Sequence, residues 1–147
     1  MSVHIRQAAS TDVASVLALY AQIDFNNDAV LSEAAAQKIF VEFSRYPSYR
    51  LFVAMEAGQV VGSYALLVMH NIAHGGMPSA VVEDVVVASA FQGRGIGRQM
   101  MDHAKEQAQS AGCYKLALSS NRKRHAAHAF YESLGFDQHG LSFVIEP

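Results

Sequence analysis

Residues 91–100, FQGRGIGRQM, constrain the fold more than any other stretch of the chain, because Gly93, Gly95 and Gly97 alternate within them. A glycine inside a regular helix or strand costs roughly 0.5–1 kcal/mol relative to alanine, so this run predicts an irregular backbone. The preceding residues 80–88, AVVEDVVVA, are typical of a strand, and a helical pattern begins at Gly95. A glycine-rich turn between a strand and a helix start presents bare N–H groups that suit an anion such as phosphate.

Two common phosphate loops do not fit these residues. A Walker loop ends in Gly-Lys followed by Ser or Thr, whereas Gly97 is followed by Arg98 and Gln99. A dinucleotide fingerprint needs a further glycine at the position of Arg98. The residues instead match the pattern Gln-x-x-Gly-x-Gly from Gln92 to Gly97.

The rest of the chain reads as short alternating strands and helices. In order, we expect a strand (3–8), a helix after caps at 10–12, a loop (24–28), a helix (32–43), a hairpin (49–57 and 59–69), a strand (80–88), a helix (95–111), a strand (114–119), a helix (123–134) and a terminal segment of one or two strands (136–145). In the 32–43 helix, Ala35, Ile39 and Phe43 predict the buried face. The strand, loop, helix and strand from residue 80 onward predict a right-handed parallel crossover.

Composition limits the class of protein. The 147 residues, 51% hydrophobic and 16% charged, suit a single compact domain over 1–147. Eleven Lys and Arg against 13 Asp and Glu give a net charge of -2, which offers no support for a nucleic-acid or membrane partner. No run of 18 apolar residues and no signal peptide is present in the sequence, and Cys113 is the single cysteine. We therefore expect a soluble cytoplasmic protein without an internal disulfide.

The glycine run resembles the acyl-coenzyme A (CoA) pyrophosphate loop of the GCN5-related N-acetyltransferase (GNAT) family. Residues 130–136, FYESLGF, resemble the late Phe/Leu-Tyr-Glu-x-x-Gly-Phe segment of the same family. The expected order of elements resembles the GNAT fold over essentially the whole chain. The resemblance implies an α/β fold with a mixed, mostly antiparallel sheet flanked by about four helices. It also implies an N-acetyltransferase that moves an acetyl group from acetyl-CoA to a primary amine of a small molecule.

Candidate cofactor-binding residues share a backbone N–H group or a positive charge near the expected phosphates and thioester. They are Val85, Val86, Val87, Gln92, Gly93, Arg94, Gly95, Ile96, Gly97, Arg98, Asn121 and Arg124. In the family an arginine is common at the position of Gln92 and an asparagine at that of Arg124.

Acyl transfer to an amine needs a neutral amine, stabilisation of the oxyanion and a proton for the departing thiolate. The resemblance implies that N–H groups near Val85–Val87 hold the acyl carbonyl oxygen. Glu83 and Asp84 are the candidate bases, and because adjacent strand residues face opposite ways, we expect at most one to point directly into the cleft. The pair could instead be structural.

Tyr131 is the candidate acid, because the family places this tyrosine near the coenzyme sulfur. A phenol with a pKa of about 10 stays protonated at neutral pH and can donate to a thiolate. The alternative is a core position on a stripe with Ala127, Phe130 and Leu134.

The seven histidines do not predict a metal site, since no cysteine or acidic cluster accompanies the spaced pairs. His70 and His74 are candidates, with Glu83, for the acceptor pocket, or they are simply solvated. A non-catalytic acyl-CoA-binding domain, a protein-lysine acetyltransferase and a homodimer all stay open.

Overall fold

The computed structural model describes residues 3–22 and 31–147, so the loop expected at 24–28 lies outside the described residues. The chain divides into two compact units, residues 1–117 and 118–147. The first unit contains the sheet, and the second contains helix α4 (His125–Ser133). Among the described residues, no helix is both long and apolar enough to cross a bilayer.

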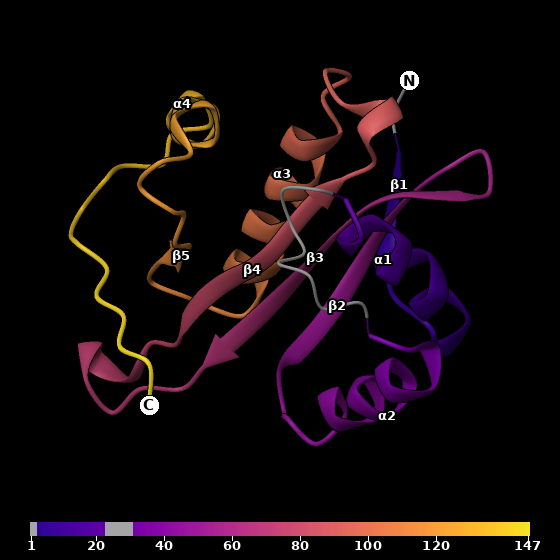
Figure 1. Ribbon diagram of the computed structural model, residues 1–147. Coiled ribbons are helices and arrows are strands. Elements are labelled where there is room, and N and C mark those ends of the chain that lie inside the picture. The colour runs from indigo at the N-terminus through magenta and orange to yellow at the C-terminus, as the bar shows by residue number, and fades with distance from the viewer. Residues whose placement is uncertain (1–2, 23–30) are drawn as a thin grey trace. The chain divides into compact units, whose positions relative to one another are not determined.

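The first unit is built on one mixed sheet (Figure 1). Its strands lie side by side in chain order: β1 (His4–Gln7), β2 (Tyr49–Glu56), β3 (Gln59–Met69), β4 (Ser79–Val87) and β5 (Leu116–Ala117). All neighbours are antiparallel except β4 and β5, which are parallel. The mixed, mostly antiparallel sheet, the hairpin and the parallel crossover are therefore confirmed.

Helices α1 (Val13–Tyr20) and α2 (Glu33–Phe43) cover one face of the sheet (Figure 1). Their shared core is a cluster of buried side chains: Ala8, Val16, Leu51, Val53 and Ala65. The predicted face of α2 is confirmed at Phe43 and was wrong at Ile39. Ala36 is buried and Phe40 and Phe43 pack on the cluster, whereas Ile39 is 50% exposed. The observed face contains both phenylalanines, and burying two aromatic rings removes more apolar surface from water.

Helix α3 (Ile96–Ser110) covers the other face. Its predicted stripe is confirmed at Ile96, Met100, Ala104 and Ala108, which are buried together with Met101, while Ala111 is exposed beyond the helix end. The sulfur of Met100 lies so close to Gly62 on β3 that a Cβ there would be 3.0 Å from it. The sheet is therefore sandwiched between α1 and α2 on one side and α3 on the other.

Two predicted strands differ in the structure. β5 contains only Leu116 and Ala117 and is half-buried, where we expected a buried strand over 114–119. Residues 136–145 of the second unit form no strand, and the side chains of Leu141, Phe143, Val144 and Ile145 are at least 85% exposed. A strand needs a hydrogen-bonded neighbour, and the apolar pattern of the tail indicated a strand without indicating what it would pair with.

Candidate active site

Strand β4 carries a β-bulge in its middle. Two of its residues, Asp84 and Val85, lie opposite the single residue Tyr64 of β3. Asp84 has a φ of 56°, in the left-handed region that few residues other than glycine and asparagine adopt readily. A bulge of this kind interrupts the regular alternation of side chains and redirects those beside it.

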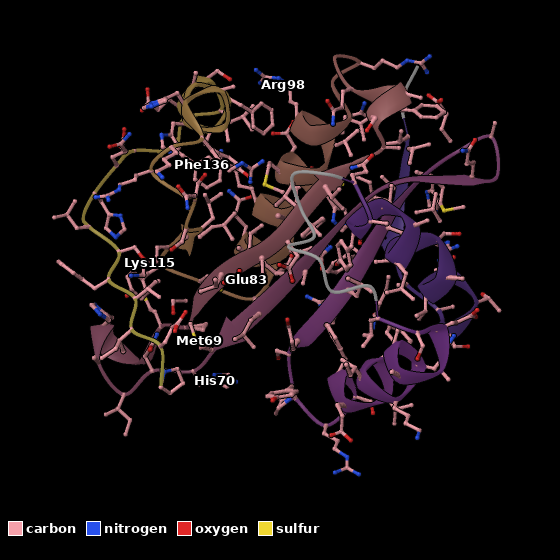
Figure 2. The ribbon with its side chains drawn as sticks, viewed as in Figure 1. Met69, His70, Glu83, Arg98, Lys115 and Phe136 are labelled. Atoms are coloured by element: carbon pink, nitrogen blue, oxygen red, sulfur yellow. The ribbon has the colours of Figure 1, made fainter. Side chains whose placement is uncertain are left out.

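The register of β4 places Glu83 on the face of the sheet that α1 and α2 cover. Glu83 pairs with Ala65, whose side chain belongs to the core under α1 and α2, so Glu83 lies on that face. Burial, followed by the charge of Asp84, raises the pKa of Tyr20 and of Tyr49, which pack on the same core cluster. The expectation that at most one of the two carboxylates points directly into the cleft stays a prediction, because the bulge interrupts the alternation of side chains at Asp84. Figure 2 shows Glu83 on the middle of β4.

Both carboxylates bind protons more strongly than free side chains do. Burial raises the pKa of Asp84, and burial together with the charge of Asp84 raises the pKa of Glu83. Both residues are nevertheless exposed in part, so they stay open to a ligand. A carboxylate with a raised pKa is a better acceptor for the proton of an ammonium group.

Two tyrosines complete this side of the site. Tyr20, in the last turn of α1, has a pKa raised by burial and by Asp84, against a hydrogen bond with Ser63. The ring of Tyr49 stacks on Phe43 with centroids 4.3 Å apart, and Tyr46 meets it edge-on at 5.6 Å. The sequence analysis missed both as site residues. Tyr20 continues the apolar stripe of α1, and nothing in the local pattern marks either hydroxyl as close to Asp84.

One edge of β4 is left without a strand partner beside the bulge. β4 pairs with β5 only at Ala80 and Val81, and no other described strand pairs with that edge from Val82 to Val87. Backbone N–H groups on this edge are therefore available to an extended ligand, whereas the carbonyl of Val87 accepts hydrogen bonds from the side chains of Gln22 and Gln92.

The direction of the N–H groups along this edge follows from the pairing with β3. Ala88 donates its N–H to the carbonyl of Val61 on β3 at 2.8 Å. Successive residues of a regular strand point their N–H groups to opposite sides, so that of Val87 faces the open edge. The N–H of Val86 faces β3, and its side chain is buried. Val85 belongs to the bulge, where the alternation is interrupted. Of the three valines proposed to hold a carbonyl oxygen, Val87 is thus the one whose N–H group the pairing directs to the open edge.

The glycine loop leads from this edge into α3. Gly93 and Gly95 have φ values of 78° and 80°, and Gly95 is the N-cap of α3. A Cβ at either position would meet no atom within 4 Å, so crowding by protein atoms does not explain these glycines. The left-handed backbone conformation does. Ile96 is buried under the helix start, and Gly97 lies in the first turn. The open space in front of the helix N-terminus suits a phosphate.

The two arginines of the loop have different surroundings. Arg94 pairs with Glu56 at 3.3 Å and lies 4.8 Å from the ring centre of Phe91, so it ties the loop to the β2–β3 hairpin. Arg98 extends from the first turn of α3 into solvent and forms no ion pair with a described residue (Figure 2). Arg98 is therefore the better candidate for a phosphate contact.

Two glutamine side chains hold the end of β4 to its surroundings. The amide groups of Gln22 and Gln92 each donate to the carbonyl of Val87 at 3.3 Å. The side-chain oxygen of Gln22 also accepts from the N–H and the hydroxyl of Ser89, at 2.7 and 2.8 Å. Gln22 was missed by the sequence analysis, because its partners are more than 60 residues away in the chain.

Tyr131 lies on α4 in the second unit and is half-buried. Its ring contacts those of Phe130 and Phe136, with centroids 5.2 and 5.7 Å apart. Burial raises the pKa of its hydroxyl, and the charge of Arg124 opposes the rise. The hydroxyl is therefore protonated at neutral pH, as a proton donor must be.

Asn121 shapes the turn before α4. Its side-chain oxygen accepts the N–H of Lys123 at 2.9 Å, and its carbonyl accepts the N–H of Arg124 at 3.0 Å. This side-chain bond occupies one acceptor of Asn121, while the exposed guanidinium of Arg124 forms no ion pair with a described residue.

The structure does not bring His70 and His74 together with the carboxylates. His70 follows the end of β3, where Met69 pairs with Ser79 (Figure 2). Ser79 and Glu83 are four residues apart on β4, roughly 13 Å along the strand. His74 stacks on Tyr114 with ring centres 4.3 Å apart. In the described part of the chain, no three His, Cys, Asp or Glu side chains are grouped as metal ligands.

Comparison with known proteins agrees with this geometry. Residues 15–136 match the Acetyltransferase (GNAT) family. An aminoalkylphosphonate N-acetyltransferase from Salmonella typhimurium is 30% identical over 95% of this chain and 88% of that enzyme. A glucosamine 6-phosphate N-acetyltransferase from Trypanosoma brucei brucei is 36% identical over 61% of the chain, which spans only 59% of that enzyme. A solved structure from Agrobacterium tumefaciens str. C58 has a TM-score of 0.91 and 38% identity, over 98% of this chain and 99% of the other.

The chain belongs to the GNAT acetyltransferase family, as the loop and the late tyrosine segment predicted. Its curated relatives across most of the chain are N-acetyltransferases that act on amines, which assigns it to the same enzyme class.

Proposed function

We propose that this protein transfers the acetyl group of acetyl-CoA to a primary amine of a small molecule by direct attack. The observation that carries the proposal is the open edge of β4, which has two carboxylates at its bulge and runs into a left-handed glycine turn at a helix start. Strand β4 and the loop that follows it thus offer, in chain order, a proton acceptor, free N–H groups and an anion site.

The cofactor part of the proposal follows from donor chemistry. The N–H groups at the start of α3 and the charge of Arg98 suit a pyrophosphate, and the edge N–H group of Val87 suits a carbonyl group of an extended acyl chain. Val85 and Val86 are kept as candidates on the family resemblance alone. Gln92 supports the loop by fixing Val87. Asn121 and Arg124 are kept as ribose-phosphate candidates on the family resemblance alone.

The proposed reaction is a single displacement. Glu83 or Asp84 takes a proton from the acceptor ammonium, directly or through one water molecule. The amine nitrogen then attacks the thioester carbonyl carbon, and an edge N–H of β4 stabilises the oxygen as it gains negative charge. The new C–N bond forms as the C–S bond breaks. The Tyr131 hydroxyl, placed here by the family resemblance, donates a proton to the thiolate. The nitrogen loses its second proton as the amide forms, and this proton passes directly or through solvent to the Tyr131 phenolate, while the carboxylate releases the first proton to solvent.

Similarity alone does not choose the acceptor. Relatives are named for phosphorylated or phosphonate amines and also for aminoglycosides, as in a Stenotrophomonas maltophilia enzyme that is 28% identical over 91% of the chain. The acceptors in these names are all small molecules with an amine, which supports a small primary amine as the acceptor here.

A thiol-release assay with acetyl-CoA and a panel of primary amines tests the proposal. We expect amine-dependent release of free CoA together with an N-acetylated product identified by mass spectrometry. If CoA raises the melting temperature but no amine releases thiol, the protein is a binding domain and not an enzyme. If only peptides with lysine are acetylated, the acceptor is a protein.

A further inference from the structure

The glycine loop before α3 is held to a distant part of the sheet by the side chain of Arg94. Arg94 lies between Gly93 and Gly95, whose φ values of 78° and 80° turn the chain toward the start of the helix. Glycine populates positive and negative φ about equally, so the two glycines permit this turn without selecting it. A contact that fixes the residue between them therefore helps to keep the loop in the conformation that presents its N–H groups to an anion.

Two contacts fix the Arg94 guanidinium. Its Nη1 atom donates a hydrogen bond to Oε2 of Glu56 at 3.3 Å, and its Cζ atom lies 4.8 Å from the ring centre of Phe91. Phe91 ends the short helix η3 (Ser89–Phe91) just before the loop, whereas Glu56 ends strand β2. The guanidinium thus connects the glycine loop with two elements that are ordered by their own backbone hydrogen bonds.

Glu56 is the more firmly held partner of this ion pair. Its side chain is 13% exposed, against 55% for that of Arg94. Its backbone pairs with Gln59 in the β2–β3 hairpin. A largely buried carboxylate is costly without a partner, so the position of Glu56 favours one position of the Arg94 side chain.

Charge alone would give Glu56 the opposite effect on an anion at the loop. A carboxylate repels a phosphate, and pairing with Glu56 offsets the charge of Arg94. Arg98, which extends into solvent from the first turn of α3, stays available to the phosphate (Figure 2). Water and salt screen the repulsion, whereas nothing screens the entropy lost when a residue between two glycines is ordered, so the ordering outweighs the repulsion.

We propose that Glu56 is a positioning residue for the coenzyme: through Arg94 it holds the glycine loop in the conformation that binds the pyrophosphate. This inference rests on the coenzyme part of the proposed function and adds to it a residue of a different element, the end of β2. It has an unusual sign. Removing Glu56 takes a negative charge away from an anion site and nevertheless weakens the binding of the anion.

Calorimetry with CoA tests this sign. We expect Glu56→Ala to raise the Kd of CoA about three- to tenfold. In thiol-release kinetics the KM for acetyl-CoA should rise by a similar factor, while kcat stays within about twofold of the wild type, since the bound coenzyme itself orders the loop. Glu42→Ala is the matched control, because it breaks another Arg–Glu pair, with Arg45 at the same 3.3 Å, on α2. The control should keep the wild-type Kd.

A double-mutant cycle determines whether Glu56 acts through Arg94. Arg94→Ala should weaken CoA binding, and Glu56→Ala added to it should change the Kd by less than about twofold. Glu56→Gln keeps the length of the side chain and an acceptor oxygen, so it covers the case in which the alanine variant does not fold. It should raise the Kd by a smaller factor than the alanine variant.

The measured Kd values also separate a failure of the inference from a failure of the proposed function. If the wild type binds CoA and the Glu56 variants bind it equally or more tightly, the inference is wrong and the proposed function stands. The same holds if Glu56→Ala weakens binding in full when Arg94 is absent. If the wild type does not bind CoA, the proposed function is wrong, and the inference is wrong with it.

Discussion

At the scale of single residues, the open question is whether Tyr131 is a proton donor or only a core residue. The variant Tyr131→Phe separates the two roles because it removes only the hydroxyl oxygen. We predict that Tyr131→Phe lowers kcat by about 10² to 10⁴, the usual effect of losing a general acid, with little change in acetyl-CoA binding. A core role would cost only a net hydrogen bond, about 0.5–1.5 kcal/mol of stability. Pre-steady-state and steady-state kinetics with one amine measure the effect. Retention of more than about a third of the wild-type kcat, with chemistry limiting the rate, would assign Tyr131 to the core.

Residues of the candidate site differ in how far the sequence could reveal them. Glu83 and Asp84 were identifiable because carboxylates interrupt an apolar strand pattern. The direction of the Asp84 side chain depends on the bulge, which changes the pairing by one residue and leaves no mark in hydrophobic periodicity. Burial and the charge of Asp84 raise the pKa of Tyr20, and both effects depend on the packing of α1 on the sheet, so they need the tertiary structure.

At the scale of elements, the turn into α3 depends on left-handed glycines, and a matched pair of variants isolates their role. Gly95 and Gly58 have φ values of 80° and 76°, and in both places a Cβ would meet no atom within 4 Å. Valine at either position is therefore strained by about 1–3 kcal/mol without crowding. We predict that Gly95→Val loses most of the rise in melting temperature that CoA produces, while Gly58→Val, in the hairpin turn, keeps it.

Thermal unfolding with and without CoA measures both glycine variants. Equal ligand shifts in the two proteins would mean that the phosphates bind away from the start of α3.

The hydrogen bonds of Gln22 at the end of β4, here called the Gln22 clamp, lead to a second prediction at this scale. Gln22 links the end of α1 to Val87 and Ser89, so it holds the open edge next to the glycine loop. We predict that Gln22→Ala raises KM for acetyl-CoA about three- to tenfold, because the edge loses one of its supports. Gln109→Ala, an exposed position on α3, is the control and should match the wild type in steady-state kinetics. An unchanged KM for acetyl-CoA in Gln22→Ala would make the clamp purely structural.

The elements that sequence predicted well are those whose signal is local. The β2–β3 hairpin follows from two strand patterns separated by Ala57-Gly58, and the stripe of α3 follows from helical spacing. The prediction of a terminal strand was wrong because strand formation depends on partners that are distant in the chain. The predicted length of β5 was too great for the same reason.

At the scale of the whole molecule, global stability should depend on pH through one ion pair. Asp12 is 6% exposed and accepts hydrogen bonds from the Arg6 guanidinium at 2.7 and 3.0 Å and from the N–H of Ala9 at 2.7 Å. The hydrogen bonds from Arg6, against burial, lower the pKa of Asp12 below its usual value. Its contribution is therefore complete above the unfolded pKa of about 3.9 and is lost as pH falls through the lower folded value.

We predict that Asp12→Asn lowers the free energy of unfolding by about 1–2 kcal/mol at pH 7, with allowance for the partly exposed guanidinium. The difference from wild type should narrow below pH 4. Urea unfolding between pH 3 and pH 7 measures it, with the exposed Glu33→Gln as control. A constant difference across this range would mean that the charge of Asp12 contributes nothing.

The extra residue in β4 has a consequence for how such a sheet can be altered. Removing Asp84 would let β3 and β4 pair without interruption and would relieve a left-handed non-glycine backbone, so the sheet itself would become more regular. The same deletion would move the valine segment and the glycine turn by one residue relative to Glu83, and it would leave one carboxylate where there were two. In this protein, a more regular sheet and the proposed acceptor site therefore exclude each other, and the presence of one residue decides between them.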